Sequence, residues 1–340
     1  MSLDRPNMPK LDSFWMPFTA NRQFKRDPEL QLADALAWQR VQPASRWLLV
    51  QEPALSQCVD KAKAEFGLET TDATAVNGEN EAAREERLNQ LVDAGCTNII
   101  GVGYIYAKAI GGAAKDNPDV SFAIIDDASA DSEGENVAQL VFAEEEGSFL
   151  VGAAAALKSK SGKVGFIGGT DVPLINKFEA GFKAGAKAVD PKIDIQTKYL
   201  AEDGSGFADP AKGKTAAEGM YDKGADVVYH AAGASGTGVF KAAAADKKMA
   251  IGVDSDQAKT AEAGLRSVIL TSMVKNVDVA VFDYIKAATT GENKAGNIVY
   301  DLKQDGVGYS TTGGRVDDIK DKLEGYKKDI IDGKVTVPEK

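Results

Sequence analysis

Short apolar segments alternate with longer helical segments along most of this 340-residue chain, and this alternation restricts the possible folds more than any other feature. The sequence predicts short, β-branched strands at 98–102, 122–125, 163–167, 193–195, 226–229 and 249–253. It predicts helices at 81–94, 147–158, 174–189, 211–223 and 274–289. Continuous apolar runs of this length are typical of parallel strands that helices cover on both faces. The repeated strand-then-helix order therefore indicates an α/β fold with right-handed parallel sheets.

Length and composition exclude several classes of protein. The 340 residues suffice for two ordinary domains, and 44% hydrophobic with 27% charged residues are globular proportions. The net charge of −11 argues against nucleic acid or an anionic membrane surface as a partner, because both attract a basic face. We find no apolar run of about 18 residues, the length that spans a bilayer, and no apolar signal segment at the start.

The cysteine and histidine content argues against a metal site. Cys58, Cys96 and His230 are too few for a structural zinc site. We expect both thiols to be unpaired, although the count alone leaves one disulfide open. His230 follows a predicted strand, where we expect a buried structural residue rather than a ligand contact.

No string in the chain has the frame of a catalytic or cofactor motif. The glycine-rich strings at 168–171 and 233–236 lack the Lys-Ser/Thr ending of a phosphate loop and the spacing of a dinucleotide-binding turn. Ser235 lacks the nucleophile-elbow frame of hydrolases. We therefore expect a protein that is not an enzyme and that uses no cofactor.

Glycines and acids follow the predicted strands, at the edge where open α/β sheets bind ligands. These strand ends lie at 101–104, 126–127, 168–171, 231–236 and 254–256. Glycine lets a ligand approach the backbone closely, and aspartate offers two acceptor oxygens to vicinal hydroxyls. Each string alone can be an ordinary turn, but the set predicts a crevice for a ligand that carries a sugar.

A series of longer strings has the order and spacing of one known family. They lie at 101–104, 122–127, 145–152, 162–169, 173–182, 207–213, 224–233, 251–257, 271–275 and 306–309. Together they resemble the basic membrane protein family, which are lipoprotein substrate-binding receptors of ABC transporters and include purine nucleoside receptors. The resemblance covers residues from about 60 to 338.

The resemblance implies a type I periplasmic-binding-protein fold, in which two doubly wound parallel-sheet lobes are joined by a hinge and ligand binds between them. Residues 58–127 plus 254–290 would form the first lobe, and 128–253 the second. Residues 291–340 would be a crossover and C-terminal segment. The implied protein is a monomer outside the cytoplasmic membrane, membrane-anchored or periplasmic. Its partners would be an ABC permease and ATPase.

The resemblance also implies the ligand residues. The acids that hold the ribose fall on Asp126 and Asp254, a glycine contact on Gly233, a lysine on Lys275, and the aromatic that stacks on the base on Phe207. Stacking of an aromatic ring on a base is worth about 1–3 kcal/mol, and a carboxylate makes charge-assisted hydrogen bonds with hydroxyls.

Alternatives remain open for three of these assignments. Phe207 can be a core aromatic, Asp127 can be the ligand acid in place of Asp126, and Lys275 can be a solvated helix charge. The ligand can be a sugar or another polar metabolite rather than a nucleoside, since a fold does not determine a ligand. A ligand-sensing domain of a regulator is a further reading, although no helix-turn-helix pattern precedes the α/β region.

The N-terminal part departs from the family. Residues 1–57 are atypical, and 1–30 resemble the N-terminal segment of class III aminotransferases through the string at 11–28. Where the family has an aromatic and an Asn that contact the ligand, this chain has 50–52, Val-Gln-Glu. We expect a fusion or frameshift here and loss of the first strand of one lobe, although 47–50 can form a strand that lies too close to the next helix for the family spacing. We also expect weaker nucleoside binding than in an intact relative, or none.

Overall fold

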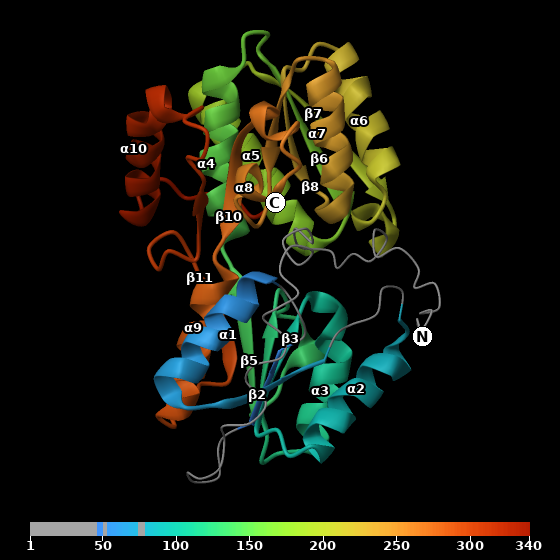
Figure 1. Ribbon diagram of the computed structural model, residues 1–340. Helices are drawn as coiled ribbons and strands as arrows, with labels where there is room; N and C mark the ends of the chain where they lie inside the picture. The colour runs from blue at the N-terminus through green and yellow to red at the C-terminus, as the bar shows by residue number, and fades with distance from the viewer. Residues whose placement is uncertain (1–45, 50–52, 74–78) are drawn as a thin grey trace, which may run out of the picture.

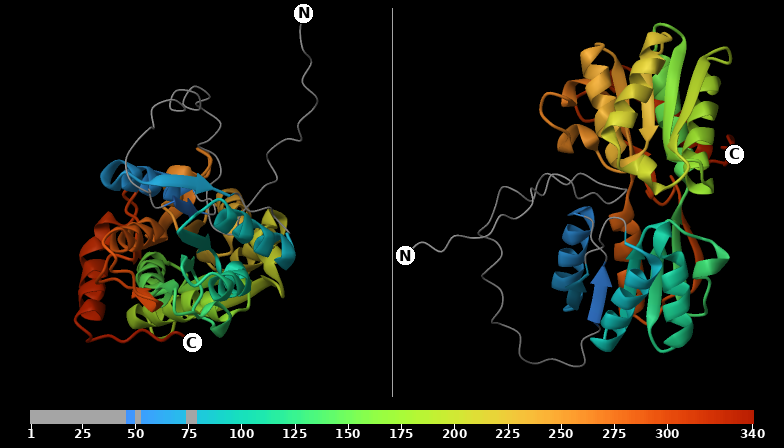
Figure 2. Two further views of the ribbon diagram at one scale, coloured as in Figure 1. Left: turned by 90° about the horizontal axis from the view of Figure 1, so that it is seen from below. Right: turned by 90° about the vertical axis from the view of Figure 1, so that its right-hand side faces the viewer.

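The computed structural model describes residues 46–49, 53–73 and 79–340, which form two lobes stacked one above the other (Figure 1). Each lobe is built on a six-stranded sheet. A view from the side shows the lobes joined by a few segments that run between them (Figure 2). The predicted α/β fold with two parallel-sheet lobes is confirmed.

The first lobe contains six parallel strands in the order β11-β5-β4-β3-β1-β2. Their bounds are β1 Arg46–Leu49, β2 Glu69–Asp72, β3 Asn98–Val102, β4 Ser121–Ile125, β5 Val137–Phe142 and β11 Gly296–Tyr300. The helices of this lobe are α1 Pro53–Phe66, α2 Glu81–Asp93, α3 Ala107–Asp116 and α9 Val277–Thr289. Helix α1 lies beside α9, and α2 beside α3, so helices cover both sides of the sheet (Figure 1).

The second lobe has the strand order β12-β10-β9-β8-β6-β7, in which only the β10–β12 pairing is antiparallel. The strands are β6 Lys163–Thr170, β7 Asp194–Ala201, β8 Val227–Ala231, β9 Met249–Gly252, β10 Ile269–Lys275 and β12 Val307–Tyr309. The helices are α4 Glu144–Lys158, α5 Pro173–Val189, α6 Pro210–Asp222, α7 Gly236–Ala245, α8 Gln257–Thr260 and α10 Lys320–Ile331. Helix α4 packs on α5, and α6 on α7.

Helices α4 and α5 touch backbone to backbone through glycines. A Cβ atom on Gly152 would lie 2.2 Å from the carbonyl oxygen of Phe182, and one on Gly181 would lie 2.0 Å from that of Glu145. Both distances are far below van der Waals contact, so only glycine fits at these positions. This contact fixes the first turn of α4 against α5.

Three segments cross between the lobes. Ala143 joins β5 to α4, Asn276 joins β10 to α9, and residues 301–306 join β11 to β12. The boundaries that we expected at 127 and 254 are corrected to about 142 and 275, because β5 belongs to the first sheet and β10 to the second.

The three crossings are hydrogen-bonded to one another. The Ala143 amide donates to the Tyr300 carbonyl at 3.0 Å, and the Leu302 amide donates to a Glu146 carboxylate oxygen at 2.9 Å. The Asn276 amide donates to the Gly306 carbonyl at 2.8 Å. The crossings therefore form one connected hinge, which matches the hinge that the family resemblance implies.

The first strand of the first lobe is present. Strand β1 lies between β2 and β3 and pairs in parallel with both. The expectation that the first strand of one lobe is lost is therefore wrong, and the alternative of a strand at 47–50 is correct for 47–49. The aminotransferase-like string at 11–28 and the Val-Gln-Glu string at 50–52 lie outside the described residues.

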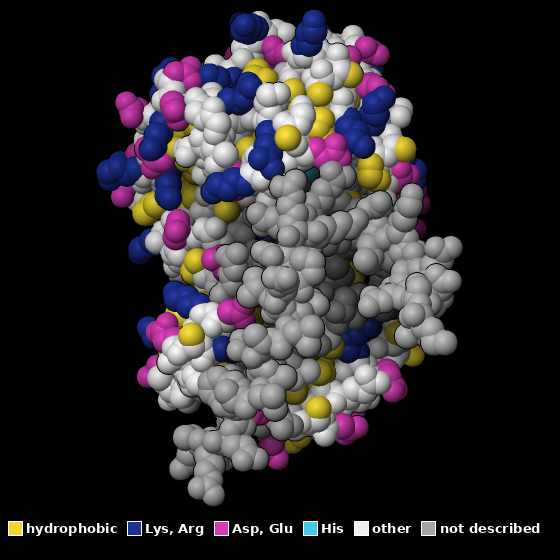
Figure 3. Space-filling view, viewed as in Figure 1, with side chains coloured by type: hydrophobic (Ala, Val, Ile, Leu, Met, Phe, Trp, Pro, Cys, Tyr) yellow, Lys and Arg dark blue, Asp and Glu magenta, His cyan; other side chains and the backbone are white. Residues whose placement is uncertain are grey.

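The surface of the described residues is mixed in charge. Figure 3 shows Lys and Arg side chains interspersed with Asp and Glu over the second lobe. Among the described residues, the large hydrophobic side chains that are exposed are Val299 and Ile331. No helix in the described ranges is both long and apolar enough to cross a membrane.

Candidate functional site

Three of the predicted ligand residues meet beside the hinge. Asp126 follows β4 in the first lobe, Asp254 follows β9 in the second, and Lys275 ends β10. The Lys275 ammonium donates to both carboxylate oxygens of Asp126 at 2.8 Å and lies 3.8 Å from Asp254 Oδ1. All three residues are buried. Side chains from both lobes thus form a single charged cluster.

The backbone at the two acids is unusual. Asp126 has φ 71° and Asp254 has φ 63°, the left-handed region that side chains other than glycine rarely adopt. Such a residue is disfavoured by roughly 1–2 kcal/mol, and strained residues cluster at functional sites. The conformation occurs within two residues of a strand end in both lobes, where an open sheet binds its ligand.

The structure distinguishes between the alternatives for two residues. The Asp127 carboxylate accepts hydrogen bonds from the Ser129 and Ser132 hydroxyls at 2.8 and 2.5 Å, so it stabilises its own loop. Asp126, not Asp127, contacts Lys275. Lys275 is a buried strand residue, so the alternative of a solvated helix charge is wrong.

Phe207 and Gly233 belong to a second group of residues. Phe207 ends a short 3₁₀ turn and packs on Gly169, where a Cβ atom would lie 2.4 Å from its ring. Gly233 begins another 3₁₀ turn with φ 50°. The Ser235 hydroxyl in that turn donates to the Gly206 carbonyl at 2.7 Å, which joins the two turns. Phe207 is 2% exposed, so it packs here as a core aromatic.

The sheet order places both groups along one edge. Strands β10, β9, β8 and β6 are neighbours, so Lys275, Asp254, Gly233 and Gly169 follow or end adjacent strands. Three steps of about 4.8 Å between strands give a row about 14 Å long. Acids and a cation lie at one end of this row and an aromatic ring at the other, an arrangement that suits a ligand with hydroxyls and a flat ring.

Sequence analysis missed a third carboxyl group in the cluster. Glu144 is the first residue of α4 and is 1% exposed. Its Oε1 atom lies 3.9 Å from the Lys275 ammonium, and its Oε2 atom lies 3.4 Å from that of Lys177. The signal for it was the Glu run 144–146 directly after an apolar segment, which was not recognised as a strand.

Burial and charge oppose each other in this cluster. Burial raises the pKa of Glu144 to about 8, although Lys275 and Lys177 act to lower it. Burial likewise raises the pKa of Asp254 to about 6. Burial would lower the pKa of Lys275, but Asp126, Asp254 and Glu144 outweigh it and raise that pKa. Lys275 therefore stays charged, and burial favours the protonated forms of Glu144 and Asp254.

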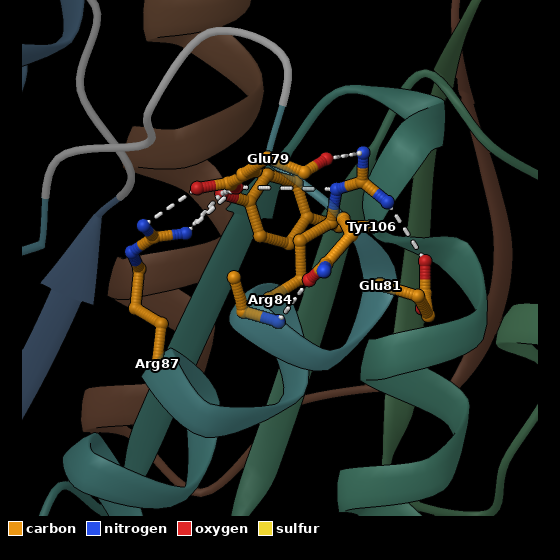
Figure 4. Close-up of polar contacts among 7 residues, drawn as sticks. Glu79, Glu81, Arg84, Arg87 and Tyr106 are labelled. Carbon is orange, nitrogen blue, oxygen red and sulfur yellow. Dashed lines mark hydrogen bonds and ion pairs between the residues drawn. The ribbon is translucent and has the colours of Figure 1, made fainter.

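A second ion-pair network stabilises the glycine-rich loop after β3 (Figure 4). The Arg87 guanidinium donates to both Glu79 oxygens at 2.7 and 2.6 Å, and the Tyr106 hydroxyl donates to Glu79 at 2.8 Å. Arg84 pairs with Glu81 at 2.8 Å. This network attaches the start of α2 to the loop that follows the string at 101–104.

Comparison with known families decides the class of the protein. Residues 53–340 match the model of the Bmp family, described as ABC transporter substrate-binding protein PnrA-like. The chain belongs to this family. The resemblance stated from the sequence is thereby confirmed, and the Bmp match includes Asp126, Glu144, Phe207, Gly233, Asp254 and Lys275.

Curated relatives and solved structures agree with the Bmp assignment. The chain is 41% identical over 275 residues to the CD4+ T-cell-stimulating antigen of Listeria monocytogenes, covering 77% of this chain and 75% of the relative. It is 40% identical over 256 residues to the ABC transporter nucleoside-binding protein BmpA of Lactococcus lactis, covering 71% of each. A solute-binding protein of an Aeropyrum pernix ABC transporter system superposes with a TM-score of 0.71 at 25% identity, over 88% of this chain and 94% of that one.

Proposed function

We propose that this substrate-binding protein captures a purine nucleoside between its lobes, does no chemistry on it, and delivers it to an ABC permease and its ATPase. The observation that carries the proposal is the contact of Asp126 in the first lobe with Lys275 in the second, beside Asp254. A ligand whose hydroxyls bind acids of both lobes would hold the lobes closed. The name of the Lactococcus BmpA relative supports the nucleoside as ligand.

The residues have separate roles in this proposal. Asp126 and Asp254 accept hydrogen bonds from the ribose hydroxyls, and Lys275 holds the Asp126 carboxylate in place through its two hydrogen bonds. Gly233 lets the ligand approach the backbone. Phe207 stacks on the base, which requires that its ring gain exposure from the buried position on Gly169 when the ligand enters.

The proposal extends to the setting of the protein. As a substrate-binding protein of an ABC transporter, the chain would act as a monomer on the outer side of the cytoplasmic membrane, anchored there or periplasmic. The Bmp family match supports this setting, because a receptor for uptake meets its solute before the permease does.

Calorimetry with a panel of inosine, adenosine, guanosine, ribose, arabinose and amino acids tests the proposal. We expect nucleosides to bind, more weakly than they bind the Lactococcus relative measured alongside. Asp126→Asn and Asp254→Asn should each lower affinity about 10- to 100-fold, since a hydrogen bond to a charged group contributes about 1.5–3 kcal/mol. Asp127→Asn is the matched control and should bind normally.

Three outcomes contradict the proposal. Binding of sugars without nucleosides would favour the alternative ligand class. Release of free base would indicate a hydrolase. Binding that Asp126→Asn and Asp254→Asn leave unchanged would place the ligand elsewhere on the molecule.

A further inference from the structure

Glu144 connects two of the three crossings. It follows Ala143, the residue that joins β5 to α4, and its carboxyl group lies 3.9 Å from the ammonium of Lys275. Lys275 precedes Asn276, the residue that joins β10 to α9. A change in the Glu144–Lys275 contact would therefore shift residues next to both crossings, and it would also alter the hydrogen bonds of Lys275 with Asp126.

The groups that face Glu144 come from several elements. Lys275 ends β10, Lys177 lies on α5, and Asp126 and Asp254 follow β4 and β9. Tyr229 on β8 is buried nearby and is affected by the Glu144 charge, and Glu145 is the next residue on α4. These groups include more carboxyl groups than ammonium groups.

The balance of charge indicates where a proton resides. Asp126 accepts two hydrogen bonds from Lys275. Neither carboxyl oxygen of Glu144 accepts a hydrogen bond from the described residues, and both atoms are buried. The ammonium groups of Lys177 and Lys275 lie 3.4 and 3.9 Å from its two oxygens, and a buried carboxylate is costly unless it is well bonded. Burial without hydrogen bonds therefore favours a proton on Glu144, and likewise on Asp254.

We propose that Glu144 is a positioning residue for the ligand site: when it holds a proton it leaves Lys275 to Asp126 and the ligand, and when it is ionised it draws Lys275 towards α4. This inference rests on the proposed function, because Lys275 and Asp126 are the groups that would hold the ligand. A neutral Glu144 adds no charge at 3.9 Å from Lys275, whereas an ionised one competes with Asp126 for the same ammonium. Ligand affinity should therefore fall as pH rises through the titration of Glu144.

Glu144→Gln tests the proposal, because the amide has the shape of the protonated acid and cannot ionise. We would measure inosine affinity by calorimetry at pH 6.5, 8 and 9. The unaltered protein should lose up to about tenfold in affinity between pH 8 and 9, the limit for one proton over one pH unit. Glu144→Gln should bind as well at pH 9 as at pH 6.5.

Glu145→Gln is the matched control. Glu145 lies in the same turn and 3.9 Å from Lys177, and no ion pair with Lys275 is seen for it. This variant should retain the pH dependence. If Glu144→Gln shows the pH dependence of the unaltered protein, or if it loses affinity already at pH 6.5, the proposal is overturned.

A measurement without ligand separates this proposal from the proposed function. Burial raises the pKa of Glu144 from 4.5 to about 8, so the folded state holds a proton there that the unfolded state releases between those values. Stability of the unaltered protein should consequently fall, relative to Glu144→Gln, as pH rises from about 4.5 to about 8. If nucleosides fail to bind, the proposed function is refuted, but urea unfolding still tests whether Glu144 holds a proton. If the stability of the unaltered protein and that of Glu144→Gln change equally with pH, Glu144 does not hold that proton and this further proposal is refuted.

If Glu144→Gln does not fold, the proposal can be tested on the unaltered protein through the protons taken up when ligand binds. Binding at pH 8.5 should take up protons, which calorimetry detects as a dependence of the binding heat on the ionisation heat of the buffer. Zero proton uptake at that pH would overturn the proposal, and so would proton release.

Discussion

Replacing Lys275 with methionine should destabilise the protein strongly at neutral pH and much less in acid. Methionine has nearly the length of the lysine stem but no charge. The ammonium that it removes lies 2.8 Å from both Asp126 oxygens, 3.8 Å from Asp254 and 3.9 Å from Glu144. Removing one partner of a buried ion pair costs about 3–5 kcal/mol. This is a large part of the roughly 5–15 kcal/mol that keeps a typical protein folded.

The loss of stability caused by Lys275→Met should depend on pH. Without Lys275, the pKa values of Asp254 and Glu144 in the folded state rise further above their unfolded values, because the cation that lowers them is gone. A group with a raised folded pKa contributes stability below its unfolded pKa and loses it as pH rises through the folded pKa. The deficit of Lys275→Met should therefore be larger at pH 7.5 than at pH 5.

Urea unfolding followed by circular dichroism at both pH values measures this deficit. Lys158→Met is a suitable control, because Lys158 pairs at 2.7 Å with Asp318, whose side chain is 67% exposed. An exposed pair contributes little to stability, so this variant should unfold close to the unaltered protein. If Lys275→Met unfolds like Lys158→Met at pH 7.5, or if its deficit is the same at pH 5, the reasoning about the buried cluster is refuted.

The other predictions concern packing, thiols and acid stability. Gly181→Ala should destabilise by about 1–3 kcal/mol in urea unfolding, because its Cβ atom would meet α4 backbone, whereas Gly112→Ala, with nothing within 4 Å, should not. Cys58 and Cys96 are free and buried, and burial raises the pKa of Cys58 to about 12. A thiol reagent should therefore label both cysteines only after denaturation. If the denatured protein is labelled at neither cysteine, the two form a disulfide and the prediction is wrong. Burial lowers the pKa of His230 to about 4, so stability should fall as pH drops from 6.5 to 4, and His230→Asn should lessen that slope in the same assay.

The alternation of apolar strands and helices was sufficient to predict the fold. Strands that are apolar throughout, such as β3 and β4, were placed within a residue of their bounds because both of their faces are buried. Strand β10 was missed, and its last residues were assigned to a helix. Its Thr271 and Ser272 are buried, and Ser310, which directly follows the neighbouring strand β12, forms hydrogen bonds with both. Polar residues in a sequence window look exposed, so the window cannot show that a residue 38 or 39 positions away will satisfy their hydrogen bonds and allow them to be buried.

Sequence predicted only some members of the buried charged cluster, again because long-range pairing is not visible in it. Asp126 and Asp254 follow strands in a visible pattern, and resemblance to a family supplied Lys275. Glu144 could not be found this way, because its role depends on β5 lying in one lobe and α4 in the other. The position of a chain crossing follows from which sheet a strand joins, and strand pairing is a long-range property.

The left-handed backbone at Asp254 places folding and the proposed binding in opposition. Neither oxygen of Asp254 accepts a hydrogen bond from the described residues, so glycine there would relieve the strain and remove a costly buried acid. Asp126 differs, because its loss would leave the Lys275 ammonium without the carboxylate that it contacts at 2.8 Å. A laboratory selection for heat resistance alone would then enrich glycine at 254 but keep Asp126, whereas a selection that also demanded uptake should keep both aspartates.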